Sequence, residues 1–169
     1  MDIPIIVQDT EGCKEKELED MKNALRKAKE EYKIEGVITG ALYSQYQRER
    51  IEKVCDELGL TIFAPLWHKN QESALREMIH HGFKFIMTKI AGWGMDKSWL
   101  GKVITTEDID RLVALNKKHG INVAGEGGEY ESLVLDAPIF NKKIAIKESD
   151  IVMEKDYIGE LRINNADLE

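Results

Sequence analysis

Short apolar runs, helical stripes and glycines follow one another in a fixed order along most of this 169-residue chain. Runs rich in apolar residues occupy residues 3–7, 36–39, 61–63, 83–90 and 121–124. Between them, apolar side chains recur every three or four positions, as on one face of a helix, over residues 14–31, 51–58, 74–79 and 109–116. Glycines that typically end a helix follow three of these stripes, at Gly59, Gly82 and Gly120. Strands that alternate with helices in this way predict a parallel sheet covered by helices.

The pattern changes after residue 125. Short β-like runs then follow one another without a helical stripe between them, at residues 130–135, 143–147, 151–153 and 161–163. Strands joined without helices predict antiparallel pairing. We therefore expect an α/β fold, in which a parallel sheet with helices precedes a second α+β lobe with an antiparallel tail. Pro65 is the expected boundary, which gives lobes at residues 1–64 and 65–169.

The charge balance excludes several classes of protein. The chain carries 24 Lys and Arg against 31 Asp and Glu, a net charge of −7. Sequence-independent nucleic-acid binding needs a basic face, so we expect no nucleic-acid partner. We also expect no membrane span and a cytoplasmic location, because no apolar run approaches about 20 residues and no signal peptide is visible at the N-terminus. Cys13 and Cys55 lie far apart outside any Cys/His cluster, which predicts reduced thiols and no structural metal.

The most suggestive segment for chemistry is residues 125–131, which we call the glycine–glutamate loop. Its three glycines let a ligand approach the backbone closely, and Glu126, Glu129 and Glu131 concentrate negative charge. Such a cluster could hold a cation or Mg²⁺, or supply a general base. A glycine-rich turn with solvated glutamates remains an equal alternative. No Lys or Ser/Thr follows the glycines as in a phosphate-binding loop.

Residues 39–47 follow a predicted strand and lead into a helix. Gly40 and Ala41 are small enough to leave the strand end open for a flat ligand such as a nucleobase. The alternative is structural, because Ser44 and Gln47 have the spacing of a capping box at a helix N-terminus.

Residues 91–101 form a long predicted loop in which Trp93 and Trp99 lie among three glycines. Long loops inside compact domains are often functional. With Trp67 and Tyr130, these residues could form an aromatic wall, and aromatic faces near carboxylates bind quaternary ammonium groups. Hydrophobic packing between the two lobes is the alternative for each tryptophan.

Four segments occur in an order and spacing typical of one family. They are Gly40-Ala-Leu-Tyr-Ser-Gln-Tyr-Gln-Arg-Glu-Arg-Ile51, Ala64-Pro-Leu-Trp67, Gly94-Met-Asp-Lys-Ser-Trp-Leu-Gly101 and Gly125-Glu-Gly-Gly-Glu-Tyr-Glu-Ser-Leu-Val-Leu-Asp-Ala-Pro138. The chain resembles the diphthine–ammonia ligase family of PP-loop, or N-type, ATP pyrophosphatases. The resemblance implies a Rossmann-like, adenine nucleotide alpha-hydrolase-like lobe followed by a lobe that carries the glycine–glutamate loop.

The resemblance also implies an activity. ATP, with Mg²⁺, activates the carboxylate of diphthine on elongation factor 2 as an acyl-adenylate with loss of pyrophosphate, and ammonia then gives diphthamide. It implies three sets of residues. The substrate side is Glu126, Gly127, Gly128, Glu129, Tyr130 and Glu131. The side that binds ATP or AMP is Thr39, Gly40, Ala41, Ser44 and Gln47. The wall around the substrate is Trp67, Trp93 and Trp99.

One departure from the family is evident. Family members begin with a strand and a Ser-Gly-Gly-Lys-Asp-Ser loop that binds the ATP phosphates, and this sequence contains no such run. Three explanations are open: the sequence is truncated, another chain supplies the strand and loop, or self-association rebuilds the sheet. An exposed sheet flank needs cover, which favours the last, so we expect a homo-oligomer. The expected function is an ATP-dependent amide ligase of this type, complete or degenerate, and the alternative is a non-catalytic module that binds a nucleotide or a cation.

Overall fold

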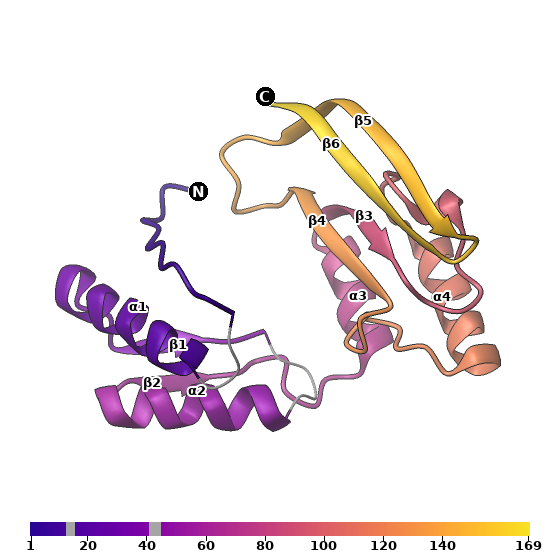
Figure 1. Ribbon diagram of the computed structural model, residues 1–169. Helices are drawn as coiled ribbons and strands as arrows, with labels where there is room; N and C mark the ends of the chain where they lie inside the picture. The colour runs from indigo at the N-terminus through magenta and orange to yellow at the C-terminus, as the bar shows by residue number, and fades with distance from the viewer. Residues whose placement is uncertain (13–15, 41–44) are drawn as a thin grey trace. The chain divides into compact units, whose positions relative to one another are not determined.

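A computed structural model describes residues 1–12, 16–40 and 45–169, and the chain divides after Lys69 into two compact units (Figure 1). The first unit ends at Lys69 and the second comprises Asn70–Glu169. Each has its own secondary structure. Together they confirm the mixed α/β class, with a small parallel sheet and a separate antiparallel sheet.

The first unit alternates helices and strands as predicted. Helix α1 covers Lys16–Tyr32 and α2 covers Gln45–Leu58, and each precedes a strand of three residues, β1 (Gly36–Ile38) or β2 (Thr61–Phe63). The two strands pair in parallel, Gly36 opposite Thr61 and Ile38 opposite Phe63. The side chains of Ile38 and Phe63 are largely exposed. The residues that precede them in the two strands, Val37 and Ile62, are half-buried. One face of this small sheet is therefore apolar and exposed within the unit.

The predicted strand at residues 3–7 is wrong. Residues 1–12 have no regular structure, and Ile3, Ile5 and Val7 are exposed. No strand of the described chain pairs with this segment. An apolar sequence alone does not make a strand, because the backbone N–H and C=O groups of a strand need a neighbour to bond to.

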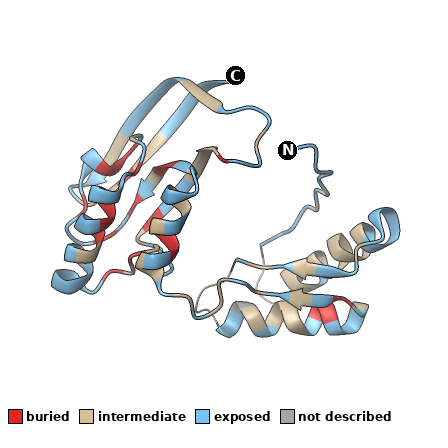
Figure 2. Cartoon of the chain, turned by 180° about the vertical axis from the view of Figure 1, so that it is seen from behind, coloured by how far each residue is buried: buried red, intermediate tan, exposed pale blue. Residues whose placement is uncertain are grey.

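The second unit is built on a four-stranded sheet in the order β4-β3-β6-β5. Its elements are α3 (Gln71–His80), β3 (Lys84–Ile90), a 3₁₀ turn at Lys97–Trp99, α4 (Thr106–His119), β4 (Tyr130–Asp136), β5 (Ile144–Lys155) and β6 (Ile158–Leu168). Both helices lie on the same face of the sheet (Figures 1 and 2). Helix α4 begins with a capping box between Thr105 and Asp108 and ends at Gly120, whose φ of 74° is the left-handed value expected there.

This unit differs from the prediction in two respects: the direction of strand β3 relative to its neighbours, and residues 121–124, which form no strand. Strand β3 was expected in a parallel sheet, but it pairs antiparallel with both β4 and β6. Residues 121–124 were expected to form a strand and form a loop instead. The N–H groups of Asn122 and Ala124 donate to the side chains of Glu129 and Gln71, so side-chain acceptors take the place of a partner strand.

The antiparallel tail is confirmed, with longer strands than predicted. The runs at 143–147 and 151–153 belong to the single strand β5, and the run at 161–163 belongs to β6. These strands form a long hairpin, joined to β3 only where Gly159 and Glu160 of β6 pair with Ile90 and Lys89.

The hydrophobic core of the second unit lies between the sheet and the helices. Met87 and Ile90 of β3 and Ile109 and Leu112 of α4 belong to this core and are completely buried. Figure 2 colours the buried segments of the unit red. No helix in the described part of the chain is both long enough and apolar enough to span a membrane.

Candidate functional site

The glycine–glutamate loop connects the segment after α4 to strand β4. Gly125 and Gly128 have φ values of 74° and 84°, which favour glycine, and the Gly128 N–H donates to the Gly125 carbonyl at 2.9 Å. A Cβ at Gly125 would lie 3.1 Å from the ring of Tyr130. Both the backbone conformation and the close contact therefore require glycine at position 125.

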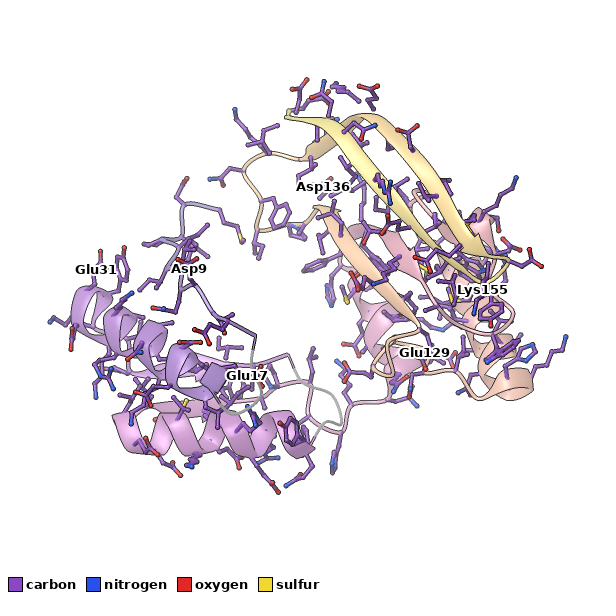
Figure 3. All side chains as sticks on the ribbon, in the orientation of Figure 1. Asp9, Glu17, Glu31, Glu129, Asp136 and Lys155 are labelled. Atoms are coloured by element: carbon purple, nitrogen blue, oxygen red, sulfur yellow. The ribbon has the colours of Figure 1, made fainter. Side chains whose placement is uncertain are left out.

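The carboxylate of Glu129 is bonded within its own loop (Figure 3 labels this residue). Its Oε1 accepts from the backbone N–H and the side-chain amide of Asn122 at 2.8 and 3.0 Å, and its Oε2 accepts from the Gly127 N–H at 2.9 Å. Burial by itself raises the pKa of Glu129, but the hydrogen bonds from Asn122 and Gly127 outweigh burial and hold the pKa below its ordinary value. Glu129 is therefore an ionised group that fixes the loop.

Gln71, the first residue of α3, extends this arrangement. Its Oε1 accepts from the Ala124 N–H at 3.0 Å, and its Nε2 donates to the Asn122 Oδ1 at 3.3 Å. We call Gln71, Asn122 and Glu129 the loop network. Sequence reasoning missed Gln71, because no local pattern relates it to residues 51 and 53 positions later in the chain.

The other two carboxylates of the loop have different surroundings. Glu126 and Glu131 are exposed, and Glu131 pairs with Lys89 of the neighbouring strand at 3.4 Å. The three carboxylates of the predicted cluster therefore differ: Glu129 points inward and is bonded to Asn122 and Gly127, whereas Glu126 and Glu131 point outward and are exposed. Among residues 1–12, 16–40 and 45–169, no three His, Cys, Asp or Glu side chains are placed to hold a metal ion.

Tyr130 lies in the core. It is 8% exposed, and its hydroxyl donates to the Val123 carbonyl at 2.7 Å. Burial, followed by the nearby charges of Glu129 and Glu126, raises the pKa of the Tyr130 phenol. The structure therefore gives Tyr130 a packing role beneath the loop.

The three tryptophans of the predicted wall have three different environments. Trp99 is 1% exposed and belongs to the core, so it cannot line an accessible wall. Trp93 is 62% exposed and stacks on Tyr157 with ring centres 4.4 Å apart, a partner that the sequence did not predict. Trp67, in the first unit, stacks on His68 and lies 4.7 Å from the guanidinium carbon of Arg48.

The predicted nucleotide-binding residues are described only in part. The Thr39 N–H donates to the Phe63 carbonyl at 3.0 Å, which continues the β1–β2 pairing by one residue. A Cβ at Gly40 would meet no atom of the described residues within 4 Å. Ala41, Ser44 and the side chain of Gln47 lie outside the described residues, and so does the predicted capping box.

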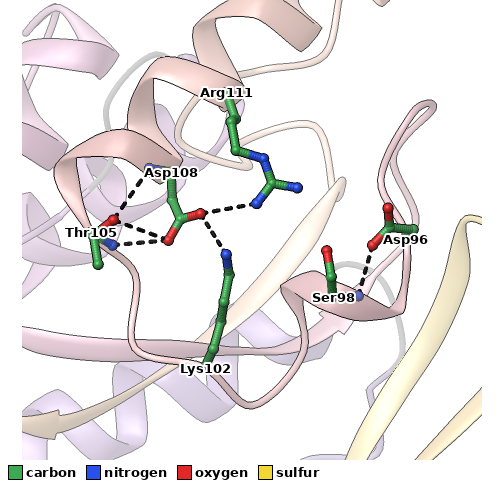
Figure 4. A network of polar contacts seen from close by, with 6 residues as sticks. All are labelled: Asp96, Ser98, Lys102, Thr105, Asp108 and Arg111. Atoms are coloured by element: carbon green, nitrogen blue, oxygen red, sulfur yellow. Dashed lines mark hydrogen bonds and ion pairs between the residues drawn. The ribbon is translucent and has the colours of Figure 1, made fainter.

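A polar network fixes the segment before α4 (Figure 4). Asp108 is 5% exposed and accepts from Lys102 at 2.5 Å, from Arg111 at 3.1 Å and from the Thr105 N–H at 3.2 Å. Burial alone raises the pKa of Asp108, but these donors outweigh it and lower the pKa. Asp96 separately caps the 3₁₀ turn by accepting from the Ser98 N–H. These contacts make residues 96–111 a rigid part of the unit.

Comparison with known proteins assigns both units to one kind of protein. A family model described as the Diphthamide synthase N-terminal domain matches residues 1–62, and one described as the Diphthamide synthase C-terminal domain matches residues 70–168. The glycine–glutamate loop and the loop network lie within the second match.

Curated relatives carry the same kind of description. Proteins named diphthine–ammonia ligase from Mus musculus and Homo sapiens are 46% and 43% identical to the chain over 142 residues, which cover 83% of the chain and 53% of each relative. A protein of that name from Saccharomyces cerevisiae is 34% identical over 140 residues, covering 73% of the chain and 20% of the relative. The chain spans about half the length of the first two relatives.

Proposed function

Because this chain belongs to the diphthamide synthase family, we propose that it acts in diphthamide biosynthesis as part of an ATP-dependent ligase that joins ammonia to diphthine. The substrate is then elongation factor 2 carrying diphthine. The observation that carries the proposal is the pair of matches at residues 1–62 and 70–168, supported by relatives named for this reaction.

We assign substrate recognition to the outward side of the glycine–glutamate loop. Diphthine carries a trimethylammonium group, and exposed carboxylates attract such a cation. Glu126 and Glu131 are exposed, whereas the oxygens of Glu129 are already bonded to Asn122 and Gly127. In this assignment Glu126 and Glu131 contact the substrate and Glu129 holds the loop between them.

The chemistry is amide formation. ATP supplies the activation that turns a carboxylate oxygen into a leaving group. The residues of this chain bind and orient the diphthine side chain so that its acyl carbon is held for attack by ammonia.

The residues present do not fit the triphosphate of ATP. The sequence has no Ser-Gly-Gly-Lys-Asp-Ser run, and the described residues offer no set of three metal-ligating side chains for Mg²⁺. We therefore derive no step at the phosphates. An adenine site at Thr39, Gly40 and Ala41 stays a prediction, supported by the open space beside Gly40.

The apolar face of the β1–β2 sheet supports a further part of the proposal, self-association. Ile38 and Phe63 are exposed on this face, and parallel sheets are normally covered on both faces. Sedimentation velocity of the 169-residue chain would test this. If the wild-type chain is an oligomer, Ile38→Ser should shift it toward monomer. A wild-type chain that stays monomeric at every concentration would contradict self-association.

The activity itself is tested with the purified chain, diphthine-bearing elongation factor 2, ATP and ammonia, with and without a second polypeptide that carries a Ser-Gly-Gly-Lys-Asp-Ser loop. The proposal expects diphthamide by mass spectrometry, with AMP and pyrophosphate released in equal amounts, when that polypeptide is present. Glu126→Gln combined with Glu131→Gln should reduce the yield. The matched control is Glu154→Gln, which neutralises an exposed carboxylate outside the loop and should leave the yield unchanged.

A second candidate function is a non-catalytic module that binds a nucleotide or a cation. The exposed carboxylates of Glu126 and Glu131 favour it, because binding a cation needs no reaction. Calorimetry separates the two: binding of AMP or of a quaternary ammonium compound without any turnover supports the module, whereas pyrophosphate release supports the ligase.

A further inference from the structure

We infer that Gln71 is a positioning residue for the glycine–glutamate loop, acting through Asn122 on the carboxylate of Glu129. The three residues come from separate places in the chain: the first turn of α3, the segment after α4 and the loop itself. Hydrogen bonds join them in sequence, from the Gln71 amide to the Asn122 amide at 3.3 Å and from there to the Glu129 carboxylate at 3.0 Å.

The segment before the loop depends on these side chains. Ile121 and Val123 are buried in the core, whereas Asn122 and Ala124 are half-buried. No strand of the described unit pairs with them. Their N–H groups are bonded by Glu129 and Gln71 instead, and a partly buried N–H left without an acceptor is costly.

A glutamine is the side chain that can make both contacts at position 71. Its amide accepts with the oxygen and donates with the nitrogen at the same time. The donated bond directs the Asn122 oxygen toward Gln71, and this leaves the Asn122 nitrogen facing Glu129. The orientation of one amide therefore fixes the orientation of the next and the position of the carboxylate.

The consequence for the site is a division of roles, and this part of the inference rests on the proposed function. Glu129 is bonded inside the loop, and Glu126 and Glu131 are left outward for a substrate. Gln71 then acts on substrate binding without touching the substrate.

The experiment compares three variants of the full chain by NMR. Gln71→Met keeps the volume and removes both hydrogen bonds, and Gln71→Glu keeps only the acceptor. The control is Glu72→Gln at the next position, whose side chain bonds to Arg76 on the helix surface. The readouts are the pKa of the Glu129 carboxyl and the exchange rate of the Gly127 amide. Neither Glu129 nor Gly127 contacts Gln71 directly.

We expect Gln71→Met to raise the Glu129 pKa toward its ordinary value and to speed Gly127 exchange about fivefold, the effect of losing one typical hydrogen bond. Gln71→Glu should also raise the Glu129 pKa, because its carboxylate repels the Asn122 oxygen and adds a like charge to the network, and Glu72→Gln should change neither readout. Faster exchange at Ala124 alone, with Glu129 and Gly127 unchanged, would overturn the inference and reduce Gln71 to a local contact. If Gln71→Met fails to fold, Gln71→Glu decides by the same two readouts.

A kinetic measurement tests whether Gln71 affects substrate binding. Where the chain shows ligase activity, Gln71→Met should raise KM for diphthine-bearing elongation factor 2 about fivefold, with a smaller change in kcat. A fall in kcat with unchanged KM would contradict a role in positioning the binding loop. Failure of the proposed ligase activity leaves the NMR result standing, so the two failures are distinguishable.

Discussion

The guanidinium carbon of Arg111 lies 4.2 Å from the centre of the Trp99 ring. The same guanidinium donates to Asp108 at 3.1 Å, so one side chain on α4 contacts both the core tryptophan and the capping carboxylate (Figure 4 shows the polar part). Trp99, predicted for a ligand wall, is instead packed in the hydrophobic core, and Arg111 lies over its ring.

Replacement of Arg111 by Met should therefore lower the free energy of unfolding by about 1 kcal/mol, since it removes the cation–π contact and one charged hydrogen bond at a half-exposed position. Urea denaturation measures this. Arg76→Met is the control, because Arg76 pairs with Glu72 and Asp110 but lies over no ring in the described part of the chain, and exposed pairs contribute little. Equal losses in the two variants would mean that the Trp99 contact contributes nothing.

Asp108→Ala should cost about 2 kcal/mol of unfolding free energy. The substitution removes half of the capping box and leaves Lys102 and Arg111 without their shared acceptor. Thr105→Ala, which removes only the other half of the box, should cost about 1 kcal/mol. Thermal denaturation of both variants gives the comparison, and a larger loss in Thr105→Ala would contradict the role given to Asp108.

The loop network predicts a specific dependence of stability on pH. The pKa of Glu129 is lowered in the folded protein, so its contribution is fully present above the unfolded-state pKa of about 4.3 and is lost as pH falls through the folded-state value. Glu129→Gln should be less stable than the wild type by about 1 kcal/mol at pH 7, and the difference should shrink below about pH 4. Urea denaturation of Glu129→Gln and the wild type across this pH range gives the comparison, and a difference that stays constant down to about pH 3 would contradict the role given to the Glu129 carboxylate.

Two glycines with the same backbone conformation allow a matched test of the loop. Gly125 and Gly120 both have φ of 74°, but a Cβ at Gly125 would meet the Tyr130 ring at 3.1 Å, whereas one at Gly120 would meet nothing within 4 Å. Gly120→Ala should cost about 1 kcal/mol, the penalty of the left-handed conformation. Gly125→Ala should cost more than this. Equal melting temperatures for the two variants would show that the ring moves aside freely.

The helices and their ends could be predicted from the sequence, because the information is local. The stripe at 109–116 and the glycine at 120 lie within a few residues of each other, and α4 ends where they indicate. Strand pairing is not local. Strand β3 has the apolar sequence of a buried strand, but nothing within residues 84–90 indicates that its neighbours run antiparallel.

The site shows the same limit. The sequence predicted a glycine-rich loop that a ligand can approach closely, and the positive φ values of Gly125 and Gly128 are seen only in the structure. The direction of each carboxylate depends on distant donors, so the sequence could not separate the inward Glu129 from the outward Glu126 and Glu131. Likewise Tyr157, the partner of Trp93, lies 64 positions later in the chain (157 − 93) in the turn between β5 and β6.

The long β5–β6 hairpin is joined to β3 only near its turn, so most of its length has open edges. An open edge invites a strand of another molecule, which is the first step of aggregation. Irregularities interrupt the pairing of the hairpin near residues 146–149, and ion pairs of Lys143 and Lys147 with Glu169 put charge at its free end. Bulges and charged residues are features by which sheets avoid edge-to-edge pairing with other molecules. Here they allow the β5–β6 hairpin to keep open edges without promoting aggregation.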